Sequence, residues 1–340
     1  MSKKLNVGII GAGRIGKVHT ETLAFRLRDK ASIVSITDVN QAAAHEAAAR
    51  FGVAEVASST QEMIADSRID AVVICSSTAT HADLVIEAAQ AGKHIFCEKP
   101  LDLTLMKIDQ ALAAVAKAGV KLQVGFNRRF DPNFARVRKA VVEGEIGTPQ
   151  MLHIISRDPS PPPLSYVRTS GGIFLDMTIH DFDMARFLIG AEVEEIYTAA
   201  GVMVDPAIGE AGDVDTAVML LRFKNGVIAT IDNSRQAVYG YDQRVEVFGS
   251  AGSIATGNCY PNEATVSTGT EISRDLPLNF FMERYMQSFG NEMREFVACV
   301  REDRPTPVTG ADARVPVVMA LAARKSHDER RPVRLSEVSA

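Results

Sequence analysis

The sequence has few cysteines, no excess of basic residues and no long apolar run, and each absence excludes a class of protein. The cysteines lie far apart with no CxxC pair, which argues against a disulfide framework or a zinc finger and favours reduced thiols in the cytoplasm. With 37 basic and 42 acidic residues the net charge is −5, so nothing draws the chain generally to nucleic acid or anionic lipid. No stretch is long and apolar enough to span a bilayer, and the first residues lead into a strand-like run rather than a signal-peptide core.

What is present points to a globular protein of about two domains. The chain has 340 residues, 46% hydrophobic and 23% charged, close to globular averages. In the first third, short runs rich in Val and Ile alternate with longer Ala-rich segments of helical spacing, which predicts an α/β fold with a doubly wound parallel sheet. The strand-like runs are 5–10, 33–37, 71–75, 94–97 and 121–125, and the helical segments are 15–28, 41–51, 80–91 and 105–118.

The pattern changes after about Phe126, so we expect one domain at 1–126 and another at 127–340. In the second half the pattern is strand, turn, strand, and Asn225-Gly226 is typical of a tight hairpin. We therefore predict a second α/β domain with a mainly antiparallel sheet and a few helices. Two amphipathic helices are expected near its end, at 280–301 and 311–325.

A glycine-rich turn follows the first strand-like run. Gly11, Gly13 and Gly16 form a GxGxxG motif between a strand and a helix. The first glycine permits the turn, the second lets the backbone approach a pyrophosphate, and the third lets the helix pack on the strand. We include Arg14 and Ile15 of the same turn in a predicted dinucleotide site, where the helix N-terminus favours the anionic pyrophosphate. Such glycines can also serve packing alone, but the flanking strand and helix favour dinucleotide binding.

Asp38 ends the second strand-like run, at the spacing expected for a ribose-binding carboxylate. Its oxygens can accept hydrogen bonds from both ribose hydroxyls, and its charge would repel a 2′-phosphate. Val39 and Asn40 follow, with no arginine to bind that phosphate. The sequence therefore predicts NAD, rather than NADP, as cofactor.

Lys99 is a candidate catalytic residue. It follows Glu98 at the carboxyl end of a strand, where open α/β sheets bind ligands. An amine there can polarise a substrate oxygen, although a surface lysine before a helix is the alternative. Glu98 and Lys99 are also expected to line the cofactor cleft. Four further residues, which follow the strand-like run ending at Cys75, are expected in the same cleft: Ser76, Ser77, Thr78 and His81. His81 could alternatively be a capping or packing residue.

A second cluster surrounds a histidine. Asp176 and His180 are four residues apart and His180 and Asp183 three, so on one helix all three share a face. A histidine bracketed by carboxylates suits general acid/base work, because imidazole titrates near neutrality. The alternatives are a structural histidine and a metal site. Without thiolates or further histidines at ligand spacing, we predict no metal.

Taken together, these motifs resemble those of one known family. The chain has GxGxxG at 11–16, Glu-Lys-Pro at 98–100, Gly-Phe-Asn-Arg-Arg-Phe-Asp at 125–131, and Asp176 four residues before His180. Their order is similar to that in the glucose-fructose oxidoreductase / inositol dehydrogenase / rhizopine catabolism family, over nearly the whole chain. Within it, the segments around Asp158 and 171–183 are most similar to the bacterial inositol dehydrogenases.

The resemblance implies an N-terminal Rossmann domain and a C-terminal domain whose open sheet is buried between subunits of a homo-oligomer, usually a tetramer. It implies oxidation of myo-inositol at the axial hydroxyl to 2-keto-myo-inositol (scyllo-inosose) in inositol catabolism, with NAD as hydride acceptor. Lys99, Asp176 and His180 carry over as the catalytic residues. In that chemistry His180 is the base, Asp176 orients its ring, and Lys99 stabilises the developing alkoxide.

A polyol substrate needs several polar anchors, and the family pattern supplies candidates. Arg128 and Arg129 could instead be solvated or salt-bridged to acidic residues, and either of them could face the substrate. Tyr239 could belong to a subunit contact. The expected substrate-binding residues are Lys99, Asn127, Arg128, Asp158, Asp176, His180, Asp183 and Tyr239.

Two other functions compete with this one. An enzyme on the same scaffold could act on scyllo-inositol, chiro-inositol or glucose, because substrate choice depends on pocket shape. A non-catalytic NAD-binding sensor is a different class, and the intact Lys99, Asp176 and His180 argue against it. DNA binding has neither a basic patch nor a reading motif to support it.

Overall fold

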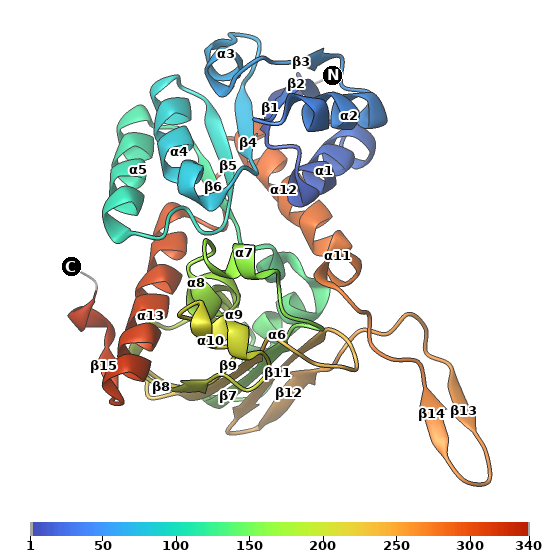
Figure 1. Cartoon of the computed structure of the whole chain (residues 1–340), viewed down its shortest axis with the longest axis vertical. Helices are drawn as coiled ribbons and strands as arrows, with labels where there is room; N and C mark the ends of the chain where they lie inside the picture. The colour runs from blue at the N-terminus through green and yellow to red at the C-terminus, as the bar shows by residue number, and fades with distance from the viewer. Residues whose placement is uncertain (1–2, 339–340) are drawn as a thin grey trace. The chain divides into compact units, whose positions relative to one another are not determined.

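The computed structural model describes residues 3–338 and divides into two compact units (Figure 1). The first unit comprises the chain up to Phe130 together with 287–317, and the second comprises 131–286 and the chain from Val318 onward. This division differs from the predicted one, 1–126 and 127–340, chiefly because 287–317 returns to the first unit.

The first unit is built on a six-stranded parallel sheet, in the order β3-β2-β1-β4-β5-β6. This order reverses beside β1, as in a doubly wound dinucleotide-binding fold, so the predicted fold class is confirmed. The strands are β1 (Leu5–Ile10), β2 (Ala31–Thr37), β3 (Glu55–Val56), β4 (Ala71–Ile74), β5 (His94–Glu98) and β6 (Leu122–Gly125). The helices are α1 (Arg14–Glu21), α2 (Gln41–Phe51), α3 (Thr60–Ala65), α4 (His81–Gln90), α5 (Leu105–Ala118), most of α12 (Met286–Arg301) and the start of α13 (Gly310–Glu329).

The core of this unit explains why a late helix belongs to it. The strands are apolar throughout because both faces of the sheet are covered, and every residue of β4 is buried. From α12, Met293, Phe296 and Val297 join the same core cluster as Val7 and Val73. Their spacing places them on one face of the helix, so the amphipathic pattern of α12 was correctly expected, but the sheet that it covers was not. The single helix predicted at 280–301 is wrong, because the helix breaks between α11 (Phe281–Arg284) and α12.

The local elements follow the sequence with a few differences. The two-residue strand β3 and the helix α3 were not predicted, because both are too short to give a periodic signal. The helical segment expected at 15–28 is α1 followed by a π-helical turn, Thr22–Arg26.

The second unit contains a seven-stranded sheet in the order β12-β11-β7-β10-β9-β8-β15. Only the β7–β10 pair is parallel, so the expected mainly antiparallel sheet is confirmed. The strands are β7 (Pro149–Arg157), β8 (Val193–Gly201), β9 (Thr216–Phe223), β10 (Ile228–Ser234), β11 (Asp242–Gly249), β12 (Gly252–Thr256) and β15 (Val333–Arg334). The helices are α6 (Pro132–Val142), α7 (Leu164–Val167), α8 (Gly172–Asp176), α9 (Thr178–Ile189), α10 (Pro206–Glu210) and α11 (Phe281–Arg284), together with the rest of α13.

A separate hairpin, β13 (Thr265–Ser267) and β14 (Ile272–Arg274), extends away from the seven-stranded sheet (Figure 1). Its Val266 and Ile272 are exposed. Across residues 3–338, no helix has the length and apolar character needed to cross a membrane.

Candidate active site

The glycine-rich turn after β1 has the shape of a phosphate cradle. Gly11 has a φ of +103°, and a Cβ there would lie 2.6 Å from the carbonyl oxygen of Cys75. A Cβ on Gly16 would overlap the carbonyl oxygen of Gly11, so the helix can approach the turn only without a side chain. Gly13, in contrast, faces open space and is exposed, as is Arg14. The turn therefore leaves room for a pyrophosphate over Gly13 at the start of α1.

Asp38 lies directly beside this turn. Its Oδ2 accepts a hydrogen bond from the backbone N–H of Ala12 at 2.7 Å, and its Oδ1 accepts one from Asn40 at 2.7 Å. These bonds fix the carboxylate at the carboxyl end of β2. Each oxygen keeps a lone pair for a ribose hydroxyl, so the residues present fit NAD.

The loop after β4 completes the edge of the cradle. Ser76 lies against Gly11, within 2.9 Å of where a Cβ would be, and its Oγ lies 2.7 Å from the Thr80 hydroxyl. Ser77 and Thr78 lie in the same loop, with Thr78 beginning a short 3-10 helix. His81 is different, because it is only 2% exposed and both ring nitrogens lie against backbone carbonyls.

Glu98 and Lys99 lie at the carboxyl end of β5. Oε1 of Glu98 is 2.7 Å from Nε2 of His19 on α1. Glu292 of α12 lies close by, and one ligand atom from each of His19, Glu98 and Glu292 falls within 4.8 Å of the others. Within residues 3–338 these three form a group with the composition of a metal site, which the sequence analysis did not identify because its members are 79 or more positions apart.

Two cysteines near this edge have thiols that are harder to deprotonate than usual. Burial, reinforced by the charge of Glu98, raises the pKa of the Cys75 thiol well above its usual range, and the same two causes raise that of Cys97. All four cysteines are free. We therefore assign no redox chemistry to Cys75 or Cys97.

Three polar residues follow β6. Asn127 is buried and donates from Nδ2 to the hydroxyl of Ser288 at 3.1 Å. Arg128 is buried, whereas Arg129 pairs with Asp312 at 3.3 Å. Arg129 therefore has the salt-bridge partner that was considered for it, and that partner lies in the first unit.

In the second unit, Asp176 and His180 lie on consecutive helices rather than on one. Asp176 is the last residue of α8, Met177 interrupts the hydrogen-bonded helix, and α9 begins at Thr178. The expected single helix is therefore wrong for Asp176 and correct for His180 and Asp183. His180 is partly exposed between the buried Ile179 and Asp181, and Asp183 is buried.

Asp176 is held by two residues that sequence reasoning missed. Its Oδ1 accepts a hydrogen bond from the Tyr166 hydroxyl at 2.8 Å, and its Oδ2 accepts one from Nη1 of Arg235 at 3.0 Å. The same Arg235 nitrogen lies 3.6 Å from Asp158. Burial disfavours the guanidinium charge, but Asp176 and Asp158 outweigh it and raise the pKa of Arg235. The result is a charged, buried link between Asp158 and Asp176.

A buried amide fixes α9 on the sheet. Asn233 of β10 donates to Asp181 at 2.9 Å and accepts from the Thr178 hydroxyl at 2.6 Å. All three side chains are fully buried. Because Thr178 and Asp181 flank His180 on the first turn and a half of α9, this network fixes the helix end that carries the histidine.

Tyr239 belongs to a different cluster. Its hydroxyl donates to Asp242 at 2.5 Å and accepts from Arg157 at 3.2 Å. Burial and the bond to Asp242 raise its pKa, so the hydroxyl stays protonated. The structure places Tyr239 with Arg157 and Asp242, and its role toward a substrate stays a prediction.

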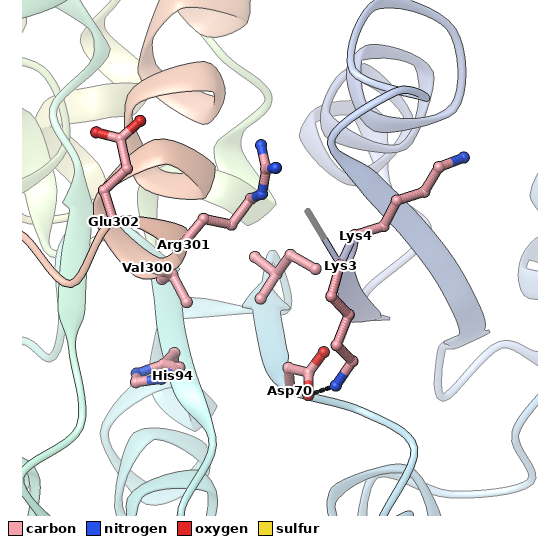
Figure 2. Close-up of a pocket in the computed structure, with 8 residues that line it drawn as sticks. Lys3, Lys4, Asp70, His94, Val300, Arg301 and Glu302 are labelled. Carbon is pink, nitrogen blue, oxygen red and sulfur yellow. Dashed lines mark hydrogen bonds and ion pairs between the residues drawn. The ribbon is translucent and has the colours of Figure 1, made fainter. Parts of the chain in front are cut away.

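A pocket of about 510 Å³ lies at the other end of the first-unit sheet. Figure 2 shows Asp70 and His94 on its wall, with Lys3 paired to Asp70 at 3.3 Å. These residues precede or begin β4 and β5, whereas the glycine-rich turn follows β1. Parallel sheets bind ligands at the carboxyl ends of their strands, so this pocket is not the candidate active site. It is lined by Lys3, Lys4, Leu5, Asp70, His94, Val300, Arg301 and Glu302.

The sheet order, the glycine cradle and the carboxylate beside it define the first unit as the dinucleotide-binding domain of an oxidoreductase. The chain belongs to the GFO/IDH/MocA family. Residues 5–126 match the oxidoreductase family with an NAD-binding Rossmann fold, and residues 134–255 match the GFO/IDH/MocA C-terminal domain. The predicted family, enzyme class and NAD cofactor are therefore confirmed.

The similarity extends over nearly the whole chain. It is 48% identical over 334 residues to the myo-inositol 2-dehydrogenase of Thermotoga maritima, covering 98% of this chain and 99% of that protein. It is 45% identical over 329 residues to the inositol 2-dehydrogenase of Rhizobium meliloti, covering 97% and 98%. The structure of scyllo-inositol dehydrogenase from Lactobacillus casei with bound NAD(H) and scyllo-inositol is 30% identical with a TM-score of 0.92, covering 98% of this chain and all of that one.

Proposed function

We propose that this enzyme oxidises myo-inositol at its axial hydroxyl to 2-keto-myo-inositol (scyllo-inosose) with NAD, in inositol catabolism. The observation that carries the substrate is the full-length similarity to a myo-inositol 2-dehydrogenase, at 48% identity. The geometry of each unit supports the reaction separately. The first unit has the dinucleotide cradle. The second has the partly exposed His180, four residues after Asp176, which Arg235 holds in place.

Oxidation of a secondary alcohol removes a hydride from carbon and a proton from oxygen. NAD, when bound, supplies the hydride acceptor. We assign the proton to His180, because an imidazole can take a proton near neutral pH and this one is partly exposed while its neighbours are buried. The network of Asn233 with Thr178 and Asp181 supports this assignment, since it holds the start of α9 rigidly.

Asp176 and Lys99 are proposed to stabilise the two charges that develop. Arg235 and Tyr166 donate to the two oxygens of Asp176, and the charge of this carboxylate would stabilise the imidazolium that forms on His180. The Lys99 ammonium would donate to the reacting oxygen and stabilise alkoxide character. The remaining proposed anchors for the substrate's hydroxyls are Asn127, Arg128, Asp158, Asp183 and Tyr239.

A second candidate substrate is scyllo-inositol. The observation that favours it is the similarity to the scyllo-inositol dehydrogenase of Lactobacillus casei, with a TM-score of 0.92. The two inositols differ only in the orientation of one hydroxyl, so the same donors and acceptors can hold the rest of the ring. Substrate choice then depends on pocket shape.

One experiment tests both candidates. NADH formation is followed with myo-inositol, scyllo-inositol, chiro-inositol and glucose, and each substrate is repeated with NADP. We expect the highest kcat/KM with myo-inositol and NAD. A higher value with scyllo-inositol would support the second candidate, faster turnover with NADP would contradict the role of Asp38, and no turnover with any polyol would support a non-catalytic sensor.

A variant of Lys99 tests the catalytic assignment. Lys99→Ala should lower kcat about 10²- to 10³-fold, as does loss of one oxyanion donor. The affinity for NADH should change little, which equilibrium binding measures. Turnover equal to that of the wild type would refute the assignment.

We also propose that the enzyme is a cytoplasmic homo-oligomer, and a tetramer in particular. Free cysteines support the cytoplasm. On the seven-stranded sheet, exposed apolar side chains lie opposite one another on neighbouring strands: Phe248 beside Met151, Met151 beside Ile228, and Leu220 beside Tyr197. Exposed apolar pairs of this kind are typical of a subunit contact.

Leu220→Lys tests the assembly. Burying a lysine in an apolar contact is costly, so we expect a smaller particle by light scattering after gel filtration. Val142→Lys, which changes an exposed apolar residue of α6, is the matched control. An unchanged mass for Leu220→Lys would contradict a contact through this face.

A further inference from the structure

The segment Glu98-Lys99-Pro100 is held on both sides by buried histidines. On one side, Nε2 of His19 lies 2.7 Å from Oε1 of Glu98. On the other, Nδ1 of His81 lies 2.8 Å from the carbonyl oxygen of Pro100. The two histidines come from different helices, α1 and α4, and both lie in the first unit. Lys99 is the residue between the two attachment points.

His19 is fixed by its surroundings as well as by this bond. It is fully buried, and its ring packs edge-on against Phe96 of β5 and Phe289 of α12, with centroids 4.9 and 5.8 Å apart. In the tautomer that carries its hydrogen on Nε2, the ring donates to Oε1 of Glu98. Glu292 lies within the same 4.8 Å group. Without the His19 donor, Glu98 would lose its bond to α1 while Glu292 remains beside it.

His81 joins two loops at the carboxyl edge of the sheet. Besides the Pro100 carbonyl, its ring contacts the carbonyl oxygen of Ser76 through Nε2, at 3.0 Å. Carbonyl oxygens only accept, so each neutral tautomer donates to one of them and the protonated ring donates to both. The ring is only 2% exposed, so water cannot readily replace these bonds. His81 therefore ties the Lys99 segment to the loop that borders the glycine cradle.

We infer that His19 and His81 are positioning residues that hold Lys99 in place for the reaction, one through the Glu98 side chain and the other through the Pro100 backbone. The inference rests on the proposed catalytic role of Lys99. Fixing the two residues that flank a long, flexible side chain limits where its amine can go. Correct placement of one donor decides much of its catalytic value, and an error of 1 Å can cost about 10²-fold in rate.

Paired substitutions at each histidine test this. His19→Leu and His81→Leu remove the donors, whereas His19→Gln keeps an N–H donor near the position of Nε2 and His81→Asn keeps one near the position of Nδ1. We expect the Leu variants to lower kcat about 10- to 10²-fold, with NADH affinity nearly unchanged, and the amide variants to recover most of the loss. A merely structural role would lower stability and NADH affinity together and would not be rescued by the amide. Where a Leu variant fails to fold, the kcat of the amide variant relative to the wild type decides, since a retained donor should retain most turnover.

His94→Gln is the matched control. His94 is half-buried at the opposite end of the same strand, β5, so its replacement should leave kcat unchanged. If His94→Gln lowers kcat as much as the His19 variants do, the effect comes from the strand in general and the inference is wrong.

A double-mutant cycle separates this inference from the proposed function. If the histidines act through Lys99, adding His19→Leu or His81→Leu to Lys99→Ala should lower the residual kcat by less than twofold, because nothing remains to be positioned. Multiplicative losses would overturn the inference while leaving the role of Lys99 intact. Wild-type turnover of Lys99→Ala alone would instead refute the proposed function at Lys99, and the inference with it.

Discussion

The two large sheets of the molecule differ in what covers them. The six-stranded sheet is parallel, and every residue of its central strand β4 is buried. The seven-stranded sheet is mainly antiparallel, and on β9 buried residues alternate with exposed ones such as Val218 and Leu220. A sheet covered on both faces needs continuous apolar runs, whereas one with a single covered face needs alternation. The exposed face of the second sheet is thus a surface available for assembly.

The candidate sites of the two units differ in the same way. The cofactor cradle is made of backbone, with Gly11 and Gly16 admitting no Cβ and an N–H of Ala12 that binds Asp38. The cluster on α8 and α9 is made of side chains, with Asp176 held by Tyr166 and Arg235. A site made of backbone should lose its function when a Cβ is added to it. A site made of side chains should lose its function when one side-chain group is removed. The predictions below test this contrast.

The largest effect is expected from removing the proposed base. His180→Ala should lower kcat about 10²- to 10⁴-fold, the usual contribution of general base catalysis, and leave NADH affinity unchanged. Steady-state kinetics and equilibrium NADH binding measure the two quantities. His327→Ala, at another partly exposed histidine of the second unit, is the control and should keep full turnover. Turnover of His180→Ala within the range of this control would contradict the assignment.

Adding one methyl group to the cradle should have the next largest effect. Gly16→Ala would bring a Cβ onto the carbonyl oxygen of Gly11, so α1 must shift away from the turn. We expect at least about a 10²-fold loss of NAD-dependent turnover, and here NADH affinity falls in parallel. Gly257→Ala, where no atom lies within 4 Å of the new Cβ, is the control. If Gly16→Ala lowers kcat but binds NADH normally, the cradle is not the cofactor site.

Much of the first unit could be predicted from the sequence because its signals are local. The first strand, the glycine-rich turn and the first helix follow one another within residues 5–21. Asp38 then follows at the spacing expected for this motif. The return of α12 could not be predicted, since an amphipathic helix shows that it has an apolar face but not which sheet it covers. The group formed by His19, Glu98 and Glu292 could not be predicted either, because its members are 79 or more positions apart in the sequence.

In the second unit the sequence located the residues but not their partners. The spacing of Asp176 and His180 made them candidates. The break at Met177 gives no signal in the sequence, because its backbone stays in the right-handed helical region and needs no glycine or proline. Arg235 looks like any arginine after a strand. Its importance comes from burial beside Asp158 and Asp176, which only the fold creates.

The buried link in the second unit gives a third prediction. Arg235→Leu leaves Asp176 and Asp158 without their shared cation, and losing one partner of a buried ion pair costs about 3 to 5 kcal/mol in the free energy of unfolding. Urea unfolding measures this, and kcat should fall as well because Asp176 loses its position. Arg136→Leu, which removes an exposed pair with Glu145, should change stability little. Equal losses in the two variants would show that the link at Arg235 is no stronger than a surface pair.

The smallest effect concerns pH and returns to the first unit. Burial, helped by the charge of Lys121, lowers the pKa of His94 in the folded protein, against the opposing charges of Asp303 and Asp70. The neutral ring accepts a hydrogen bond from the backbone N–H of Lys121 at 3.1 Å. The unfolded chain therefore binds the proton more tightly, so the stability from His94 is full above the unfolded pKa of about 6.5 and is lost as pH falls through the lower folded value.

His94→Gln should remove this contribution and flatten the fall of unfolding free energy between neutral and mildly acidic pH. Urea unfolding at a series of pH values measures the slope. Lys121→Met removes one cause of the lowered pKa and should flatten the slope less, because burial remains. A slope that is unchanged in His94→Gln would mean that the acid sensitivity comes from other groups. A slope flattened more by Lys121→Met than by His94→Gln would mean that Lys121 acts through a partner such as Asp303, with which it forms an ion pair at 2.7 Å.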